Sequence, residues 1–272
     1  MDTILEALPA LGTTGVGAAL AMKSPELLKE IYGDLAKPGV KQVGKAIGCL
    51  LGLGNTVLLP LRLLNEVSRA FETKVFSQIA DRFEKIPDDR IVSPPPEIGI
   101  PLLDKLSQTQ DATLREMFIE LLARASDSRC VDQVHPSFSQ VIGSIVPDEA
   151  IILRGLHSRK LHPIISVDVV SQDRDKGSVV LHDLVMKLPV KIKQEKNLPL
   201  YLSNLVGLGV LEIDRERHLV TPHIYDDTIN YAKEKFSLPD EMVIDSDLRK
   251  VGYKKFICGL SPYGCRLIEA CS

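Results

Sequence analysis

The sequence predicts a mainly α-helical protein with a smaller α+β part. Three observations predict it: glycine-rich apolar segments near the N-terminus, apolar residues at helical spacing through the middle of the chain, and runs of β-branched residues that begin only near His162. We expect N-terminal apolar helices, a central helical bundle and a C-terminal module resembling a winged helix. The predicted domains are residues 1–92, 93–160 and 161–272.

Two uncharged, glycine-rich segments mark the N-terminal region. They run from Ala7 to Met22 and from Ala46 to Leu61, and the second lies between Lys45 and Arg62. Each glycine costs a helix about 1 kcal/mol relative to alanine, so glycines at four-residue spacing indicate a close neighbouring helix. In lipid this pattern is typical of a helix-association face. The predicted membrane or helix-packing residues are Gly44, Gly48, Gly52, Asn55, Pro60 and Arg62.

The second apolar segment is short for a membrane span, since a hydrocarbon core of about 30 Å needs about 20 helical residues. The segment would span the membrane if Arg62 snorkelled. It could instead lie in the membrane interface or form half of a hairpin. The other interpretation is a buried helix of a soluble bundle.

Composition limits the function classes. The net charge of −3 excludes a globally basic nucleic-acid binder, although not a local basic patch. Tryptophan is absent, so the sequence lacks the aromatic belt that is typical of an ordinary integral membrane protein. The five cysteines form no CxxC pair, which favours a reducing compartment.

The middle of the chain is helical in pattern. A proline run at 93–96 favours an extended connection and a domain boundary. The predicted helices cover 65–86, 98–106 and 112–125, with two more beginning near His135 and at Pro147.

The C-terminal region changes period. Residues 162–170 and 177–192 are rich in β-branched side chains, which favours short strands. A helix is predicted from Asn197 to Gly207 or Gly209, and two strands, 210–213 and 218–221, would flank the polar turn 214–217. This order of helix and hairpin is typical of a winged helix.

Basic residues cluster around this predicted module. Lys191 and Lys193 alternate with Val190 and Ile192, so a strand there would project both ammonium groups from one face. Such a face binds phosphates without reading bases; the alternative is a solvated strand edge that lysines protect against aggregation. The candidate ligand-binding residues are Arg154, Arg159, Lys160, Lys187, Lys191, Lys193, Arg215 and Arg217.

No enzyme signature is recognisable. The sequence contains no Walker loop, no GxGxxG, no GxSxG and no HExxH. We therefore expect a protein that is not an enzyme, with no catalytic residues, no metal site and no cofactor.

Several segments resemble the Abi-alpha, or abortive infection alpha, proteins of bacteria. They are IYGDLAKPGVKQVGKAIGCLLGLGNTVLLPLRLLNE, KIPDDRIVSPPPEIGIPLLDKLS, LREMFIELLARASDS, HPSF and SPYGCRLIEAC. The resemblance covers residues 31–271, and a final strand followed by a helix with Ser261 as N-cap completes the pattern. It implies a role in defence against phage, in which an activated effector arrests or kills the infected cell, and it implies no catalytic residues.

Together these observations predict an oligomeric antiphage effector that permeabilises, or forms a channel in, the bacterial inner membrane, with its C-terminal domains in the cytoplasm. An anionic ligand such as a single-stranded oligonucleotide would gate it, and a co-encoded regulatory protein is a further expected partner. The alternative is a soluble, cytoplasmic helical interaction or nucleic-acid-binding protein whose apolar segment is buried core.

Overall fold

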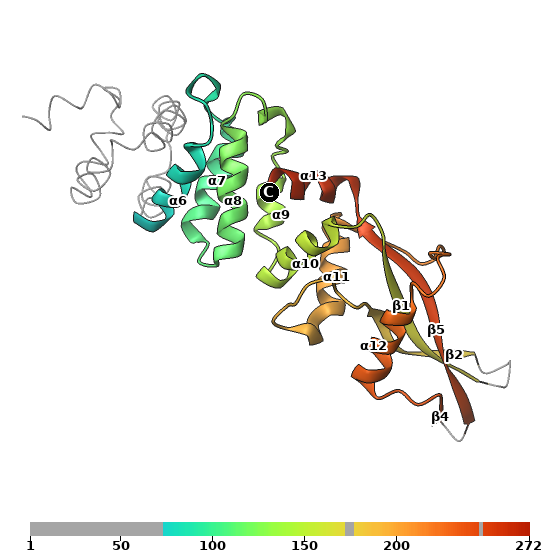
Figure 1. The fold of residues 1–272 in the computed structure, drawn as a ribbon. Coiled ribbons are helices and arrows are strands. Elements are labelled where there is room, and N and C mark those ends of the chain that lie inside the picture. Colours follow the sequence, from blue (N-terminus) through green and yellow to red (C-terminus); the bar gives the residue numbers. More distant parts are fainter. Residues whose placement is uncertain (1–72, 172–176, 245–246) are drawn as a thin grey trace, which may run out of the picture. The chain divides into compact units, whose positions relative to one another are not determined.

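The computed structural model describes residues 73–171, 177–244 and 247–272, which divide into two compact units (Figure 1). The described part of unit 1 runs to Ser144 and includes Glu269–Ser272, and unit 2 comprises Ile145–Ile268. The predicted domain limits remain predictions. Both N-terminal apolar segments lie outside the described residues, as do the predicted packing residues Gly44, Gly48, Gly52, Asn55, Pro60 and Arg62.

Unit 1 is helical. Its helices are α6 (Thr73–Phe83), α7 (Pro96–Gln108), α8 (Ala112–Ala125) and α9 (Phe138–Ile142). The helix predicted at 112–125 is confirmed, and it begins where Asp111 caps it: the carboxylate accepts hydrogen bonds from the amides of Thr113 and Leu114, at 2.8 and 3.2 Å. The fully buried side chains of unit 1 include Phe83, Leu102 and Phe118. None of the helices in the described ranges has the length and apolar character to cross a membrane.

Unit 2 combines helices with a sheet. Its elements are α10 (Pro147–His157), β1 (His162–Ser171), β2 (Ser178–Val185), α11 (Leu198–Gly207), β3 (Leu211–Asp214), α12 (Asp226–Phe236), β4 (Glu241–Ile244), β5 (Asp247–Leu260) and the greater part of α13 (Pro262–Ala270). The predicted N-cap of the last helix is confirmed, because the Ser261 hydroxyl accepts a hydrogen bond from the Gly264 amide at 2.9 Å.

The sheet is antiparallel throughout, in the order β2-β1-β5-β3. The β1–β5 pairing is the longest and runs from His162 opposite Cys258 to Ser171 opposite Arg249. On the other edge, β3 pairs with the C-terminal end of β5 and β4 with its N-terminal end. β5 therefore joins three other strands into one sheet.

The prediction of a mainly α protein with a winged-helix module is wrong. The described residues are 47% helix and 22% strand, and the strands form one curled five-stranded sheet. Helix α11 and strand β3 occur where predicted, but β3 pairs with β5, and residues 218–221 form no strand. The Leu219 amide instead donates to the Tyr225 hydroxyl at 3.0 Å, so a side chain satisfies the amide that a wing partner would have used.

Two irregularities in β2 bend the sheet. Ile165 lies opposite Val185, Val167 opposite His182 and Asp168 opposite Val180. At each of these two steps β2 advances by one residue more than β1, so β2 carries an extra residue twice. Between these pairs Leu184 has φ of 53°, which a side chain other than glycine seldom adopts. Bulges of this kind bend a strand and increase its twist, which accounts for the curl.

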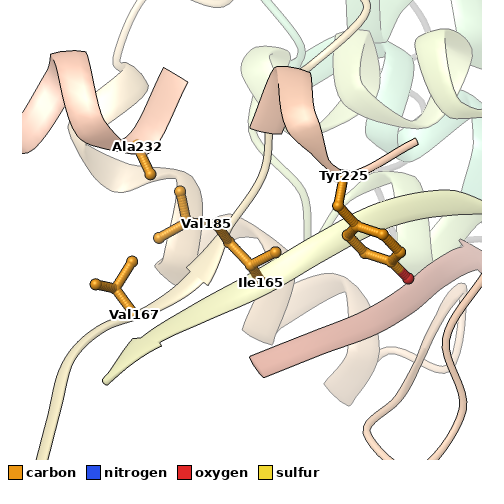
Figure 2. Packing of buried hydrophobic residues seen from close by; sticks show 5 residues of the cluster. All are labelled: Ile165, Val167, Val185, Tyr225 and Ala232. Carbon is orange, nitrogen blue, oxygen red and sulfur yellow. The ribbon is translucent and has the colours of Figure 1, made fainter. Parts of the chain in front are cut away.

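Helix α12 covers one face of the sheet. Figure 2 shows the core of this contact, where Ile165 and Val167 of β1 meet Val185 of β2 and, from the helical side, Tyr225 and Ala232. All five side chains are almost fully buried. This packing fixes the loop that precedes α12, because Tyr225 stands at the N-cap position of that helix.

Candidate functional site

The basic segment 187–196, between β2 and α11, has a fixed backbone. The Asp148 carboxylate, in the first turn of α10, accepts hydrogen bonds from the amides of Lys193 and Gln194 at 2.9 and 2.8 Å. The Val190 side chain packs against Gly155, where an added Cβ would lie 2.8 Å from both Val190 methyl carbons. Ile192 is buried between the exposed Lys191 and Lys193. Residues 190–193 are not a strand, but the alternation of burial is the predicted one.

The lysines of this segment differ in their partners. Lys187 lies 3.8 Å from the Asp227 carboxylate at the start of α12. Lys191, Lys193 and Lys196 are exposed, and across the described parts of the chain none of them has a carboxylate within 4 Å. The segment thus presents three uncompensated cations on an ordered frame.

The two predicted arginines after β3 are already paired. Arg215 donates two hydrogen bonds to Asp183 of β2, at 3.1 and 2.7 Å, and its guanidinium carbon lies 5.1 Å from the centre of the Phe256 ring. Arg217 donates to Asp214 at 2.5 Å. Binding of a ligand to either guanidinium would compete with these carboxylates.

The remaining predicted cations lie near the end of α10. Arg154 is half-buried on that helix, and Arg159 and Lys160 are exposed in the turn that leads to β1. The Lys160 carbonyl packs against Gly259, where a Cβ would lie 2.6 Å from it. The structure therefore places the eight predicted residues in three groups: α10 with its following turn, segment 187–196, and the paired arginines after β3.

Sequence reasoning missed a concave site beside α12. A cavity of about 330 Å³ is lined by residues 218–226 together with Lys255 of β5. Its framework is Tyr225, whose hydroxyl donates to the Phe256 carbonyl at 2.7 Å and accepts from the Leu219 amide. The Lys255 ammonium lies 5.3 Å from the centre of the Tyr225 ring. The sequence shows His218 and His223 close together, but Lys255 joins them only through the strand pairing of β5, which is long-range.

Unit 1 holds a second charged cluster. Glu120 of α8 is nearly buried and lies between Arg82 and Arg124, in contact with the first and 3.6 Å from the second. Asp127 pairs with Arg90, and hydrogen bonds from that arginine and the Arg129 amide outweigh burial and lower the pKa of Asp127. These carboxylates each have a cationic partner, so the cluster serves the packing of unit 1. No group of three metal-ligating side chains with suitable geometry occurs in the described ranges.

Comparison with known families decides the assignment. The family model described as abortive infection alpha, Abi_alpha, matches residues 67–271, well over half of the chain. The chain belongs to the Abi-alpha family. The resemblance expected from the sequence is thereby confirmed, and Abi-alpha membership gives this chain a role in abortive infection, a defence against phage. Comparisons with curated proteins and with solved structures found no match.

Proposed function

We propose that this Abi-alpha chain is an effector that oligomerises and permeabilises the bacterial inner membrane through its N-terminal apolar segments, and that an anionic ligand bound by unit 2 gates it. The observation that carries the proposal is the set of exposed lysines on segment 187–196, of which Lys191, Lys193 and Lys196 have no carboxylate within 4 Å among the described residues. Their backbone is held by Asp148 and Ile192, so the positive charge is ordered before any ligand arrives.

The membrane step is supported by the sequence of the N-terminal region. Gly44, Gly48 and Gly52 recur at four-residue spacing, the last two within the uncharged run 46–61, and this spacing lets helices approach closely in lipid. The recurring glycines need a close neighbouring helix and a pore needs several copies of the chain, so oligomerisation is part of the proposal.

The membrane step is tested by its order in time. Expression of the full chain in bacteria should depolarise the inner membrane, measured with a potential-sensitive dye, before DNA or RNA is degraded. Gly48→Leu should abolish the depolarisation, whereas Gly39→Leu, outside the apolar run, should not. A wholly soluble protein in fractionation without detergent, with toxicity unchanged by Gly48→Leu, would contradict the membrane step and favour the soluble interaction protein.

The ligand step is tested by charge reversal. The triple variant Lys187→Glu, Lys191→Glu and Lys193→Glu should lose at least tenfold in affinity for a single-stranded oligonucleotide, measured by fluorescence anisotropy at a fixed salt concentration. Lys250→Glu, at an exposed position on β5, is the matched control and should change affinity by less than twofold. Unchanged binding in the triple variant would remove segment 187–196 from the site.

A further inference from the structure

We infer that the cavity formed by residues 218–226 and Lys255 binds a phosphate monoester of mononucleotide size. The inference deepens the proposed function, since it rests on that proposal only for the gating role of the ligand. It names a second subsite of unit 2, separate from the lysines of segment 187–196.

A cationic side chain stands in a concave site. Lys255 is exposed, lines the cavity and stands over the Tyr225 ring, and across the parts of the chain that the structure describes no carboxylate lies within 4 Å of its ammonium. An aromatic face stabilises an ammonium group but leaves it free to donate to an anion. A phosphate oxygen is the complementary partner.

The rim of the cavity offers hydrogen-bonding and stacking groups. His218 and His223 are exposed at the cavity, and an imidazole offers both a hydrogen-bonding nitrogen and a ring on which a base stacks. Val220, which also lines the cavity, is 88% exposed, so an apolar surface stands next to the cation. Convergent polar groups beside apolar walls are typical of small-molecule sites, and about 330 Å³ is at the small end of their range.

The backbone of the loop 218–226 is held in a strained shape. His223 has φ of 60°, a left-handed conformation that is unfavourable for a side chain other than glycine. Its ring nitrogen bonds the Asp226 carboxylate at 2.7 Å, and the two hydrogen bonds of the Tyr225 hydroxyl fix both ends of the loop. Strained residues persist where surrounding contacts hold them, and they cluster at ligand sites.

The cavity adjoins the basic segment through the first turn of α12. Asp226 lines the cavity, and the next residue, Asp227, is the partner of Lys187. A ligand longer than one nucleotide with a phosphate at Lys255 would extend near the Lys187–Asp227 pair.

The test uses the purified full chain and three probes: adenosine 5′-monophosphate, adenosine and inorganic phosphate, titrated by isothermal calorimetry. We expect the monophosphate to bind at least tenfold more tightly than adenosine. Lys255→Met keeps the aliphatic stem and should lower that affinity at least tenfold, while the control Lys250→Met should stay within twofold. His218→Ala is the second variant, used if Lys255→Met does not fold by circular dichroism, and should lower affinity at least threefold.

Each outcome decides between the two proposals. Binding of inorganic phosphate as tight as that of the monophosphate would reduce the site to a phosphate site and contradict mononucleotide recognition. No binding of any probe, or equal affinity in Lys255→Met and Lys250→Met, overturns the inference even if the triple lysine variant loses oligonucleotide binding. Binding that depends on Lys255 without any depolarisation on expression would preserve the site and contradict the proposed function.

Discussion

Arg215 and Asp183 join opposite edges of the sheet. Arg215 directly follows β3, and Asp183 lies on β2, and these strands stand at the two ends of the order β2-β1-β5-β3. Strands are spaced about 4.8 Å apart, so a flat sheet would hold these edges about 14 Å from one another. The curl brings the two edges close enough for Arg215 to donate two hydrogen bonds to Asp183, with the guanidinium over the Phe256 ring. The bulges in β2 and this ion pair therefore stabilise the same curvature.

The Arg215–Asp183 pair should make stability depend on acid pH. Burial alone would raise the pKa of Asp183, but hydrogen bonds from Arg215 and the Leu184 amide, with the arginine's charge, hold that pKa below its ordinary value. The stability from this group is present above the unfolded pKa of about 3.9 and is lost as the pH falls through the lower folded value. In urea unfolding, Asp183→Asn should cost about 0.2–1 kcal/mol at pH 7, since both partners are half-exposed, and progressively less as the pH falls below about 3.9. A cost that does not change with pH would contradict the ion pair.

Gly264 of α13 should not tolerate a side chain. A Cβ there would lie 2.0 Å from the Val210 carbonyl oxygen and 2.9 Å from its carbon, both backbone atoms that cannot rotate away. We expect Gly264→Ala to destabilise unit 2 by about 3 kcal/mol or more, measured by urea unfolding. Gly207, in α11, is the control: nothing lies within 4 Å of its Cβ position, so Gly207→Ala should be neutral or stabilise by up to about 1 kcal/mol. Equal effects of the two changes would show that α13 does not pack as described.

Protonation of His182 should weaken the contact between β2 and α12. Its ring stacks on Phe236 with centroids 3.8 Å apart and planes at 10°, and burial lowers its pKa. The folded state therefore favours the neutral ring, and the stability from it is lost as the pH falls below the unfolded value of about 6.5. His182→Phe should be less sensitive than the parent protein to a change from pH 7.5 to pH 5 in urea unfolding.

Cys258 should resist alkylation in the native protein. Burial raises the pKa of its thiol to about 12, so almost no thiolate exists at pH 8. Cys130 and Cys265 are only partly buried and should react with iodoacetamide first. Peptide mapping by mass spectrometry should find Cys258 modified less than a tenth as much as Cys265, and equally after denaturation in urea. Rapid native labelling of Cys258 would indicate that the β1–β5 pairing opens often.

Local patterns predicted the helices better than the sheet. Asp111 and the apolar spacing of residues 112–125 specify α8 within one stretch of sequence, and Asn197 to Gly207 does the same for α11. The error at residues 218–221 arose because a short β-branched stretch does not reveal its partner. The strand that pairs with β3 is β5 instead, and the Leu219 amide donates its hydrogen bond to the Tyr225 hydroxyl.

The same limit applies to the candidate site. Clustering in the sequence identified Lys187, Lys191 and Lys193, and the exposure of the last two follows from the burial of Ile192, which lies directly between them. The partner of Arg215 lies 32 residues earlier in the chain, and Lys255 meets the loop 218–226 only through the strand pairing of β5. Nothing near Lys255 in the sequence distinguishes it from Lys254, which instead lies 2.5 Å from the buried Asp168.

The position of β5 in the sheet has a consequence for synthesis on the ribosome. β1 forms ten residue pairs with a strand that begins at Asp247, so the sheet cannot close until almost all of unit 2 has been translated. Pairings between distant segments form slowly because loop closure precedes any gain from contact. Before that point the β1–β2 hairpin has one edge without its partner, the edge that β5 will cover. Chains stalled shortly before residue 247 should therefore be the ones that chaperones bind and proteases cleave.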